Sequence, residues 1–468
     1  MTTEHFTNQA NKNIRNKFLQ QRLALITNEF INKRQTAVEK IPDWQEWRAA
    51  AQKIKSHSIN HLDLYLETFE KNLIQAGGQV HWCQTGEEAC EKILHICQKK
   101  NAKLVVKSKS MVAEEIALKE HLNKNNINLV ETDLGDYILQ IRGDKPSHSI
   151  APALHIDKTM VAESFKKHHK NLSRHRVFNT TSDLIHEVRG LMRKNFLTAD
   201  VGITGANFLV AESGSVILVT NEGNADLVAS LPPTHIVITT IDKIVPTLYD
   251  ASHLLRLLCR SATGQALTSY ASFFTGIKQK DDSDGGDELH VILLNNNRTQ
   301  LLAPSMRSAL SCIKCGACLN HCPIYQTVGG NSYSGSQMGP IGAAIAPTII
   351  GEKKANDMAF ASTLCGRCDE ICPVKIPISH LLRHQREWSF LQKNTDKKKQ
   401  KMLRQFRDAS QSVKKFRKTT HFIRKILRFY NRNGVIKKIP MLNITKNWFL
   451  KKDLPTPPKQ SFLDRIKK

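Results

Sequence analysis

The chain has 468 residues, which is enough for two or three domains and a large apolar core. Its 40% content of apolar residues excludes a disordered chain, and the absence of an apolar run of about 18 residues excludes an ordinary membrane-spanning helix. The formal net charge of +26 predicts an anionic partner, and nucleic acid, an anionic membrane face or an acidic protein would each satisfy it.

Residues 1–75 are expected to form a helical N-terminal extension. Apolar residues recur at helical spacing from Asn16 to Ile41, Pro42 breaks the pattern, and a new helix is expected to follow. Asp43 is the predicted N-cap of that helix. The polar start of the chain lacks the apolar centre of a signal peptide, so we expect a cytoplasmic protein.

Residues 76–300 alternate short β-branched runs with helical patterns. Strands are expected at 103–107, 127–132 and 236–241, with a helix at 111–124. This alternation predicts an α/β domain with a mainly parallel sheet. Residues 208–220 predict two strands around a turn at Ser213 and Gly214, and 278–287 predict a polar surface loop.

Polar and turn-forming residues are concentrated at 202–224, around those two strands. One interpretation is a small-molecule or anion site. Its contacts would come from Thr204, Asn207, Glu212, Thr220 or Asn221. The other interpretation is turn chemistry, because glycine permits positive φ and asparagine stabilises turns. Residues 107–109, Lys-Ser-Lys, follow a strand and precede a helix, where an anion could also bind. No nucleophile–base pair is legible here, so no catalytic residue is assigned.

Seven of the eleven cysteines lie within the stretch 301–385, which predicts a local metal site in a reducing compartment and not a disulfide framework. The first motif, C-x2-C-x2-C-x3-C-P, contains Cys312, Cys315, Cys318 and Cys322. Two-cluster ferredoxins have this spacing, and their fourth cysteine ligates the other cluster. Structural zinc is the alternative, although zinc sites usually separate one cysteine pair from a second pair or from histidines.

The second motif is the same motif without its first cysteine, whose position is taken by Ser362. Exchange of the fourth ligands between the motifs predicts two clusters. Cluster 1 would use Cys312, Cys315, Cys318 and Cys372, and cluster 2 would use Cys322, Cys365 and Cys368. The open corner of cluster 2 leaves alternatives: a [4Fe-4S] cluster completed by Ser362, water or a partner's group, a [3Fe-4S] cluster, or a labile cluster. A protein with cluster 1 alone is the plainest alternative.

The other cysteines, Cys83, Cys90, Cys97 and Cys259, are interpreted as structural. Residues 386–468 are expected to form a basic helical C-terminal extension. Fourteen lysines and arginines but only two acids lie between residues 393 and 428, and apolar residues recur at helical spacing over 402–416. We expect this apolar face to cover the protein's own core. Docking to an acidic partner or an anionic membrane surface is the alternative. No nucleic-acid-binding motif accompanies the charge, so we do not expect nucleic-acid binding.

The chain resembles the lactate-utilisation iron–sulfur protein B (YkgF-type) family. The matching segments include GGQVHWC at 77–83, VVKSKSMVAEEI at 105–116, ETDLGDYILQ at 131–140, PSHSIAPALH at 146–155, GITGANFLVAESGSVILVTNEGN at 202–224, LPPTHIVI at 231–238, the cysteine motifs, and CPVKIPI at 372–378. The resemblance implies a LUD domain at 76–300, similar in fold to the NagB/RpiA/CoA-transferase group. It also implies an α-helical, ferredoxin-type domain with two [4Fe-4S] clusters at 301–385.

The same resemblance implies a role in oxidising L-lactate to pyruvate. The family works with two companions, a CCG-domain protein and a smaller LUD-domain protein. In this role the chain relays electrons to an acceptor that the sequence does not specify, and the lactate-oxidising centre is shared or lies on a partner. The alternative is that the LUD domain is itself a ligand-binding or catalytic module, with clusters that serve structure or redox sensing.

Overall fold

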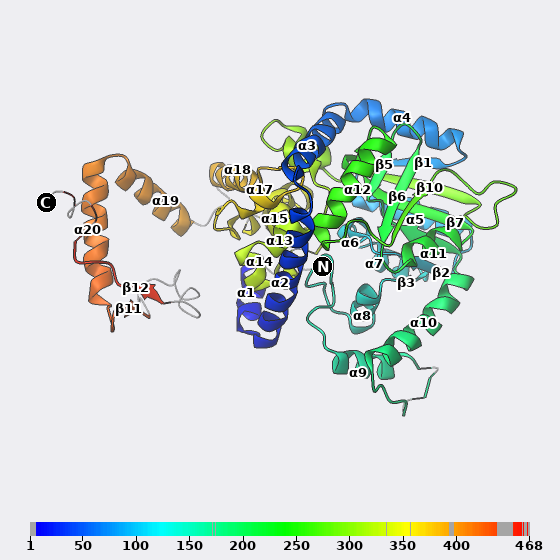
Figure 1. Cartoon of the computed structure of the whole chain (residues 1–468), viewed down its shortest axis with the longest axis horizontal. Helices are drawn as coiled ribbons and strands as arrows, with labels where there is room; N and C mark the ends of the chain where they lie inside the picture. Colours follow the sequence, from blue (N-terminus) through cyan, green and yellow to red (C-terminus); the bar gives the residue numbers. More distant parts are fainter. Residues whose placement is uncertain are drawn as a thin grey trace. The chain divides into compact units, whose positions relative to one another are not determined.

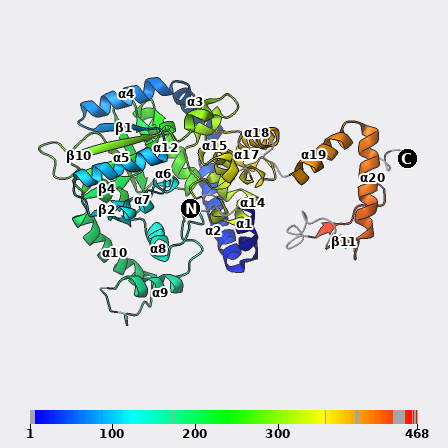
Figure 2. The ribbon, with the colours of Figure 1, turned by 180° about the vertical axis from the view of Figure 1, so that it is seen from behind.

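The computed structural model describes residues 6–170, 172–173, 175–333, 335–355, 357–392, 397–437, 453–460, 462 and 466. Met1–Trp388 form one compact unit and Ser389–Lys468 form a second. Within the first unit, the N-terminal helices run beside the helices of the cysteine-containing region, and an α/β part lies on their other side (Figure 1). The same arrangement is seen from behind in Figure 2.

The N-terminal part is helical, as predicted. Its helices are α1 (Phe6–Arg15), α2 (Lys17–Glu39), α3 (Trp44–Asn60) and α4 (Leu62–Gln75). The predicted break at Pro42 falls between α2 and α3. Asp43 is the N-cap residue of α3, but its side chain makes no capping hydrogen bond. Its carboxylate instead accepts a hydrogen bond of 2.8 Å from Trp47 Nε1, one turn into the helix.

A parallel six-stranded sheet forms the centre of the α/β part, which confirms the predicted class. In spatial order its strands are β1 (Gln79–Cys83), β10 (Glu288–Leu294), β7 (Thr234–Thr240), β4 (Val201–Thr204), β2 (Leu104–Lys107) and β3 (Asn128–Glu131). Strands β4 and β7 are buried along their whole length, as expected where both faces of a parallel sheet are covered.

Helices cover both faces of this sheet. They are α5 (Gly86–Lys99), α6 (Met111–Glu115), α7 (Leu118–Lys124), α8 (Leu134–Arg142), α9 (Lys158–His168), α10 (Thr181–Thr198) and α11 (Asn224–Ser230), whereas α12 (Leu248–Ala262) packs against α2 and α3. Side chains of α5 and α7 share one apolar cluster with the sheet, and those of α8, α9 and α10 share another. Cys90 and Cys97 lie in the first cluster, as their helical spacing predicted.

The single helix predicted at 111–124 is wrong, because the structure has two helices, α6 and α7, separated by a left-handed residue. Ala117 has φ 55° and ψ 41°. The break allows the carbonyl of Ile116 to accept a hydrogen bond of 3.5 Å from the Cys90 thiol, while Leu118 and Leu122 are fully buried in the core. Tertiary packing therefore outweighs helix propensity at this point.

The predicted pair of strands around Gly214 belongs to a second, four-stranded sheet. Its order is β8 (Ile244–Val245), β5 (Phe208–Val210), β6 (Ser215–Thr220) and β9 (Tyr270–Phe274). Strands β5 and β6 pair antiparallel, which confirms the predicted turn. Gly214 has φ +66°, and a Cβ there would lie 2.5 Å from the backbone nitrogen of Leu73, so both conformation and space require glycine.

The order of the parallel strands defines where a ligand can enter. Strand β2 is followed by β3 on one side, whereas β4, β7 and β10 lie on the other side. Adjacent loops therefore leave β2 and β4 in opposite directions, which opens a crevice outside the carboxyl ends of these strands. The segments that follow β2, β4 and β7 at this edge are 108–110, 205–207 and the short helix η1 (Ile241–Lys243).

The cysteine-containing region consists of short helices, as predicted. They are η2 (Arg298–Leu302), η3 (Arg307–Ser311), α13 (Ala317–Asn320), α14 (Pro323–Val328), η4 (Gly330–Ser332), α15 (Gly339–Ile349), α16 (Glu352–Ala355), η5 (Met358–Phe360), α17 (Arg367–Ile371) and α18 (Ile378–Leu391). Helices α1 and α2 pack against α14, and α3 packs against η3. The N-terminal helices therefore help to enclose the cysteines.

The second unit contains α19 (Lys397–Ser410), α20 (Val413–Phe429), β11 (Val435–Ile436) and β12 (Leu454–Pro455). The apolar pattern at 402–416, predicted as one basic helix, spans two helices. The chain begins a new helix at Ser412, because the Ser412 hydroxyl caps α20 by accepting a hydrogen bond from Lys415 N. None of the α20 residues is buried, and its cover of the protein's own core stays a prediction. In the described part of the chain, no helix has the length and apolarity needed to cross a membrane.

Candidate metal centre

Four of the predicted cysteines converge at one buried place. Burial raises the pKa of the Cys318 thiol well above its ordinary value, and the nearby sulfurs of Cys312, Cys315 and Cys372 raise it further. Burial likewise raises the pKa of Cys315 to about 12, with Cys372 and Cys312 as neighbours. Without a cation these thiols would hold their protons, and a bound metal would convert them to thiolates. The predicted set for cluster 1 is therefore brought together.

The other three cysteines also lie together, with Cys322 and Cys368 buried and Cys365 exposed. Burial raises the pKa of the Cys368 thiol, and the Asp369 carboxylate, Cys322 and Cys365 raise it further. Cys365 is exposed, and the backbone N–H of Arg367 is the main cause of its lowered pKa. The predicted set for cluster 2 is thus also brought together, with one member facing solvent.

The two motifs repeat the same local geometry. Gly316, with φ +73°, precedes α13, and Gly366, with φ +80°, precedes α17. A left-handed residue between the first and last cysteine of a C-G-x-C segment reverses the chain tightly, so both sulfurs face the same side. Such a turn strains any residue other than glycine, which explains the glycine in both motifs.

The arrangement fits iron–sulfur clusters better than zinc. All seven cysteines are free thiols. Among the described residues, no three Cys, His, Asp or Glu side chains lie close enough to hold a single metal ion. A cubane distributes its ligands over four metal atoms, so its thiolates stand further apart than the four ligands of one zinc ion. Two loosely spaced groups of sulfurs are what such clusters require.

Two buried arginines hold the loop that carries Cys372. Arg48, on α3, donates hydrogen bonds from Nε at 3.0 Å and from a terminal nitrogen at 2.7 Å to the Cys372 carbonyl. Arg34, on α2, donates one of 3.1 Å to the Ile371 carbonyl. Both side chains are 7% exposed. Neither arginine was predicted from the sequence, although Arg48 lies at helical spacing from the apolar residues Trp44 and Ala51, which is the signal that could have revealed it.

Two buried lysines approach the same group from the other side. Lys243 Nζ lies 3.5 Å from the Cys312 carbonyl oxygen. Lys55 Nζ donates a hydrogen bond of 2.7 Å to the Asp242 carbonyl, and burial lowers the pKa of Lys55 to about 8. Arginines and lysines thus lie around the group of Cys312, Cys315, Cys318 and Cys372, and this charge would offset the negative charge of a thiolate-bound cluster.

The surroundings of the exposed group are different. The Cys368 thiol lies 3.4 Å from Asp369 Oδ1, so an acid adjoins this group. The hydroxyl of Ser362, the predicted substitute ligand, accepts a hydrogen bond of 3.1 Å from Leu364 N. The side chain that contacts the Cys365 sulfur is Thr363. The fourth ligand of cluster 2 therefore stays a prediction.

A cavity of about 380 Å³ connects the crevice at the strand ends with the buried cysteines. Its wall includes residues of the segments after β2, β4 and β7, and Cys312, Cys315, Cys318 and Cys372. Among the polar residues predicted for a ligand site, Asn207, Thr220 and Asn221 line it, together with Ser108 and Lys109. Part of this volume is the space between the four cysteines that cluster 1 itself would fill, so a ligand would occupy the remaining part at the strand ends.

Three of the predicted polar residues have structural roles instead. Thr204 is fully buried and its hydroxyl bonds His235 Nε2 at 2.8 Å. The Glu212 carboxylate accepts a hydrogen bond from Leu248 N at the start of α12. Lys107 is buried beside Glu131, with 2.9 Å between Nζ and the carboxylate. Residues at strand ends can point into the core as easily as into a crevice, and the sequence pattern does not separate the two.

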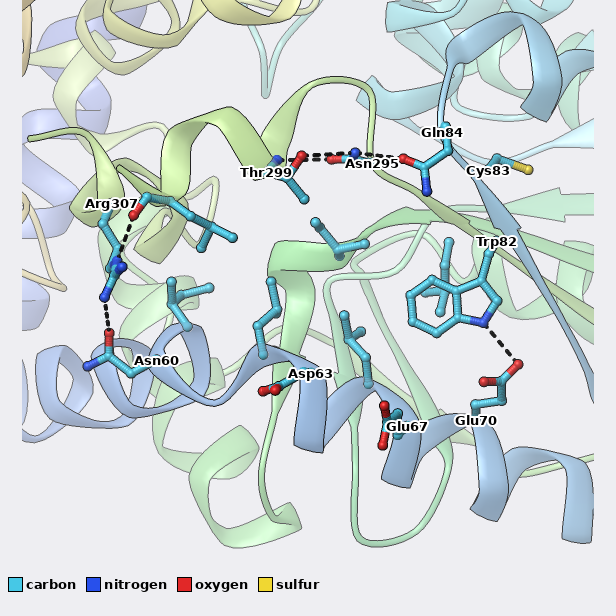
Figure 3. Close-up of a pocket in the computed structure, with 16 residues that line it drawn as sticks. Asn60, Asp63, Glu67, Glu70, Trp82, Cys83, Gln84, Asn295, Thr299 and Arg307 are labelled. Carbon is cyan, nitrogen blue, oxygen red and sulfur yellow. Dashed lines mark hydrogen bonds between the residues drawn. The ribbon is translucent and has the colours of Figure 1, made fainter. Parts of the chain in front are cut away.

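A second cavity, of about 600 Å³, lies between α4 and the carboxyl ends of β1 and β10 (Figure 3). Its wall carries three carboxylates from α4, Asp63, Glu67 and Glu70, and one cation, Arg307. Glu70 accepts a hydrogen bond of 2.9 Å from Trp82 Nε1. This cavity contains none of the seven clustered cysteines.

Comparisons with known proteins match two separate parts of the chain to family models. Residues 66–294 match the family model described as LUD domain, and residues 308–376 match the one described as 4Fe-4S dicluster domain. Lactate utilization protein B of Shouchella clausii (strain KSM-K16) is 40% identical over 463 residues, covering 99% of this chain and 96% of the relative. The protein of that name from Bacillus subtilis (strain 168) is 38% identical over 464 residues, with coverages of 99% and 96%.

A crystal structure of a DUF162 family protein from Deinococcus radiodurans matches at 15% identity and a TM-score of 0.27, covering 50% of this chain and 98% of that one. The two relatives from Shouchella clausii and Bacillus subtilis, in contrast, extend over 99% of this chain. From their identity and coverage, the chain belongs to the lactate utilization protein B family.

Proposed function

We propose that this chain carries electrons through two iron–sulfur clusters in the oxidation of L-lactate to pyruvate. The observation that carries the proposal is the grouping of the cysteines, in which Cys372 joins the first motif and Cys322 joins the second. The names of the relatives supply the link to lactate. Lactate releases two electrons and a cluster accepts one, so a pair of clusters suits this reaction.

The assignment has a buried cluster 1 with four cysteine ligands and a cluster 2 with three. Of the seven cysteines, Cys365 is exposed, Cys312 is partly buried and the other five are buried. Cluster 2 is therefore the one that a partner protein can approach, and cluster 1 is the inner centre.

Single replacements test the exchange of ligands. Protein purified without oxygen should contain roughly seven to eight irons and show absorption that dithionite bleaches. Cys312→Ser and Cys372→Ser should remove the same electron paramagnetic resonance (EPR) signal, although these residues belong to different motifs. Cys365→Ser should remove the other signal. Loss of different signals in Cys312→Ser and Cys372→Ser would refute the exchange, and iron-free wild-type protein would refute the function.

We also propose that the chain works with a CCG-domain protein and a smaller LUD-domain protein. The test is reduction of the clusters by L-lactate, followed by their absorption, with the purified chain alone and with each companion added. Reduction that requires a companion supports a shared or external oxidising centre. Full-rate reduction of the chain alone would refute the need for partners.

A second candidate function is favoured by the cavity at the strand ends. The LUD domain would bind a small molecule itself, and the clusters would serve structure or redox sensing. Calorimetry distinguishes ligand binding from electron transfer when candidate ligands are titrated into the protein with its clusters and into protein stripped of them. Binding that is unaffected by cluster removal and by cluster oxidation state favours this candidate over electron transfer.

A further inference from the structure

The cavity of about 380 Å³ places two features in one space: the ligand-binding edge of the parallel sheet and the sulfurs assigned to cluster 1. One end is formed by residues that follow β2, β4 and β7, such as Lys109 and Asn207. The other end is formed by the cysteines of the buried group. A molecule held at the strand ends would therefore lie beside cluster 1, with no protein layer between them.

Two cations from different strand ends face this space. Lys109 follows β2, and its side chain is 28% exposed with Nζ 3.4 Å from the Ile150 carbonyl and 3.9 Å from Asp136. Lys243 follows β7, is 6% exposed, and makes one long hydrogen bond of 3.5 Å to the Cys312 carbonyl. An ammonium has three donors, so both side chains can accept an anionic partner in addition to these contacts.

The same wall also contains buried polar atoms that lack a hydrogen-bond partner within the described part of the chain. Gln337 is 1% exposed and donates a hydrogen bond of 2.7 Å to Glu115. Its Oε1 atom and the hydroxyl of Ser149 have no hydrogen-bond partner within the described part of the chain. A buried acceptor without a donor is costly, by about 1–3 kcal/mol, and a ligand that carries a hydroxyl group would supply one.

We propose that this cavity binds a small 2-hydroxy- or 2-oxocarboxylate beside cluster 1, with Lys109 and Lys243 contacting the carboxylate. The choice of this ligand class rests on the proposed function, while the location rests on the cavity and its charges. The site for the organic acid then lies in this chain, at the junction of the LUD domain and the cluster region.

The other large cavity is unsuited to such a ligand. Three carboxylates and one guanidinium line the space beside α4 (Figure 3), so an organic acid would be repelled there. The wall of the cavity that reaches cluster 1 carries three acids, Glu115, Asp133 and Glu222, and four cations, Lys109, Lys243, Arg298 and Lys314. Glu115 accepts two hydrogen bonds from Arg298, at 3.0 and 2.9 Å. Charge therefore distinguishes the two cavities.

Binding of the carboxylate in this cavity and reduction of cluster 1 should influence each other. A bound carboxylate and the extra electron of a reduced cluster repel each other, so the ligand should bind more weakly to the reduced protein. By thermodynamic reciprocity, the ligand then makes cluster 1 harder to reduce. If binding is tenfold weaker in the reduced state, the potential falls by about 59 mV at saturation. Cluster 2, outside the cavity, should not respond.

The experiment measures pyruvate binding to oxidised full-length protein by calorimetry and the cluster potentials by EPR-monitored titration, with sodium acetate as the ionic-strength control. Lys109→Gln should weaken pyruvate binding tenfold or more, and Lys109→Arg should restore most of it. Lys100→Gln is the matched control, because Lys100 is 33% exposed and paired with Glu288 at the opposite, amino-terminal edge of the sheet. It should bind pyruvate like the wild type.

Iron and sulfide are measured first on every sample. Equal binding by Lys109→Gln and Lys100→Gln, a response of cluster 2 in place of cluster 1, or an equal response to acetate would overturn the inference. Full clusters without pyruvate binding would overturn this inference alone. Iron-free wild-type protein would overturn the proposed function and the inference together.

Discussion

Replacement of Arg48 by methionine should lower the reduction potential of cluster 1. The guanidinium is 7% exposed and bonds the carbonyl of Cys372 at 3.0 and 2.7 Å. Reduction adds one negative charge to the cluster, and a buried cation beside a ligand residue favours that state. Methionine preserves most of the side-chain volume but removes the charge and the two hydrogen bonds to the Cys372 carbonyl, so Arg48→Lys, which keeps the charge, is needed beside it.

The size of the shift follows from the position of the charge. Because the guanidinium contacts the backbone of a ligand residue, its separation from the cluster centre is on the order of 8 Å, and an effective dielectric of about 20 gives an interaction of about 2 kcal/mol. For transfer of one electron this energy corresponds to about 90 mV. We therefore expect Arg48→Met to lower the potential of cluster 1 by about 90 mV, and Arg48→Lys to recover most of that loss.

EPR-monitored potentiometry on anaerobic protein is the assay, with Cys365→Ser protein used to identify the signal of cluster 1. Arg256→Met is the control, because it removes the same charge from an exposed arginine. The Arg256 guanidinium stacks 4.0 Å from the ring centre of Trp47, the residue before Arg48. Arg256→Met should leave both potentials nearly unchanged. Equal shifts in Arg48→Met and Arg256→Met, or a shift confined to cluster 2, would show that the reasoning is wrong.

Three further predictions concern the α/β part. Gly202→Ala should destabilise the protein by about 3 kcal/mol or more, because a Cβ would lie 1.9 Å from a carbonyl oxygen of α11. Gly190→Ala should stabilise the protein by about 1 kcal/mol, because nothing lies within 4 Å of a Cβ there. The urea midpoints of the two variants test this difference. Lys107→Met leaves the buried Glu131 carboxylate without its 2.9 Å partner and should cost about 3–5 kcal/mol at neutral pH. Burial already raises the pKa of Glu131 to about 7, so the carboxyl takes up a proton in the folded state and the loss should shrink at pH 5; an equal loss at both pH values would contradict this. Burial lowers the pKa of His235 to about 3, so its contribution to stability is present above pH 6.5 and is lost as the pH falls toward 3. Between pH 7 and 4.5 the wild type should lose about 2–3 kcal/mol more than His235→Gln, as measured by denaturant titration, and parallel losses would refute the assignment.

Local features of this protein were legible in its sequence. The spacing of the cysteines is dictated by the reach of neighbouring thiolates around one cluster, so a few consecutive residues carry the whole signal. The strand at Leu104–Lys107 and the turn at Gly214 follow in the same way from β-branched runs and from a left-handed glycine. Such features depend on contacts within a turn or two, which a pattern of neighbouring residues expresses directly.

Tertiary structure alone decided what surrounds the cysteines. Arg48 is 324 residues away from Cys372 along the chain, and only the packing of α3 against the cluster region brings them together. The break at Ala117, the pairing of Lys107 with Glu131, and the cavity that joins the strand ends to the cysteines also arise from contacts between distant segments. Sequence spacing determined which atoms can bind iron, whereas folding determined the charge, burial and accessible space around them, because those depend on which distant side chains share the same volume.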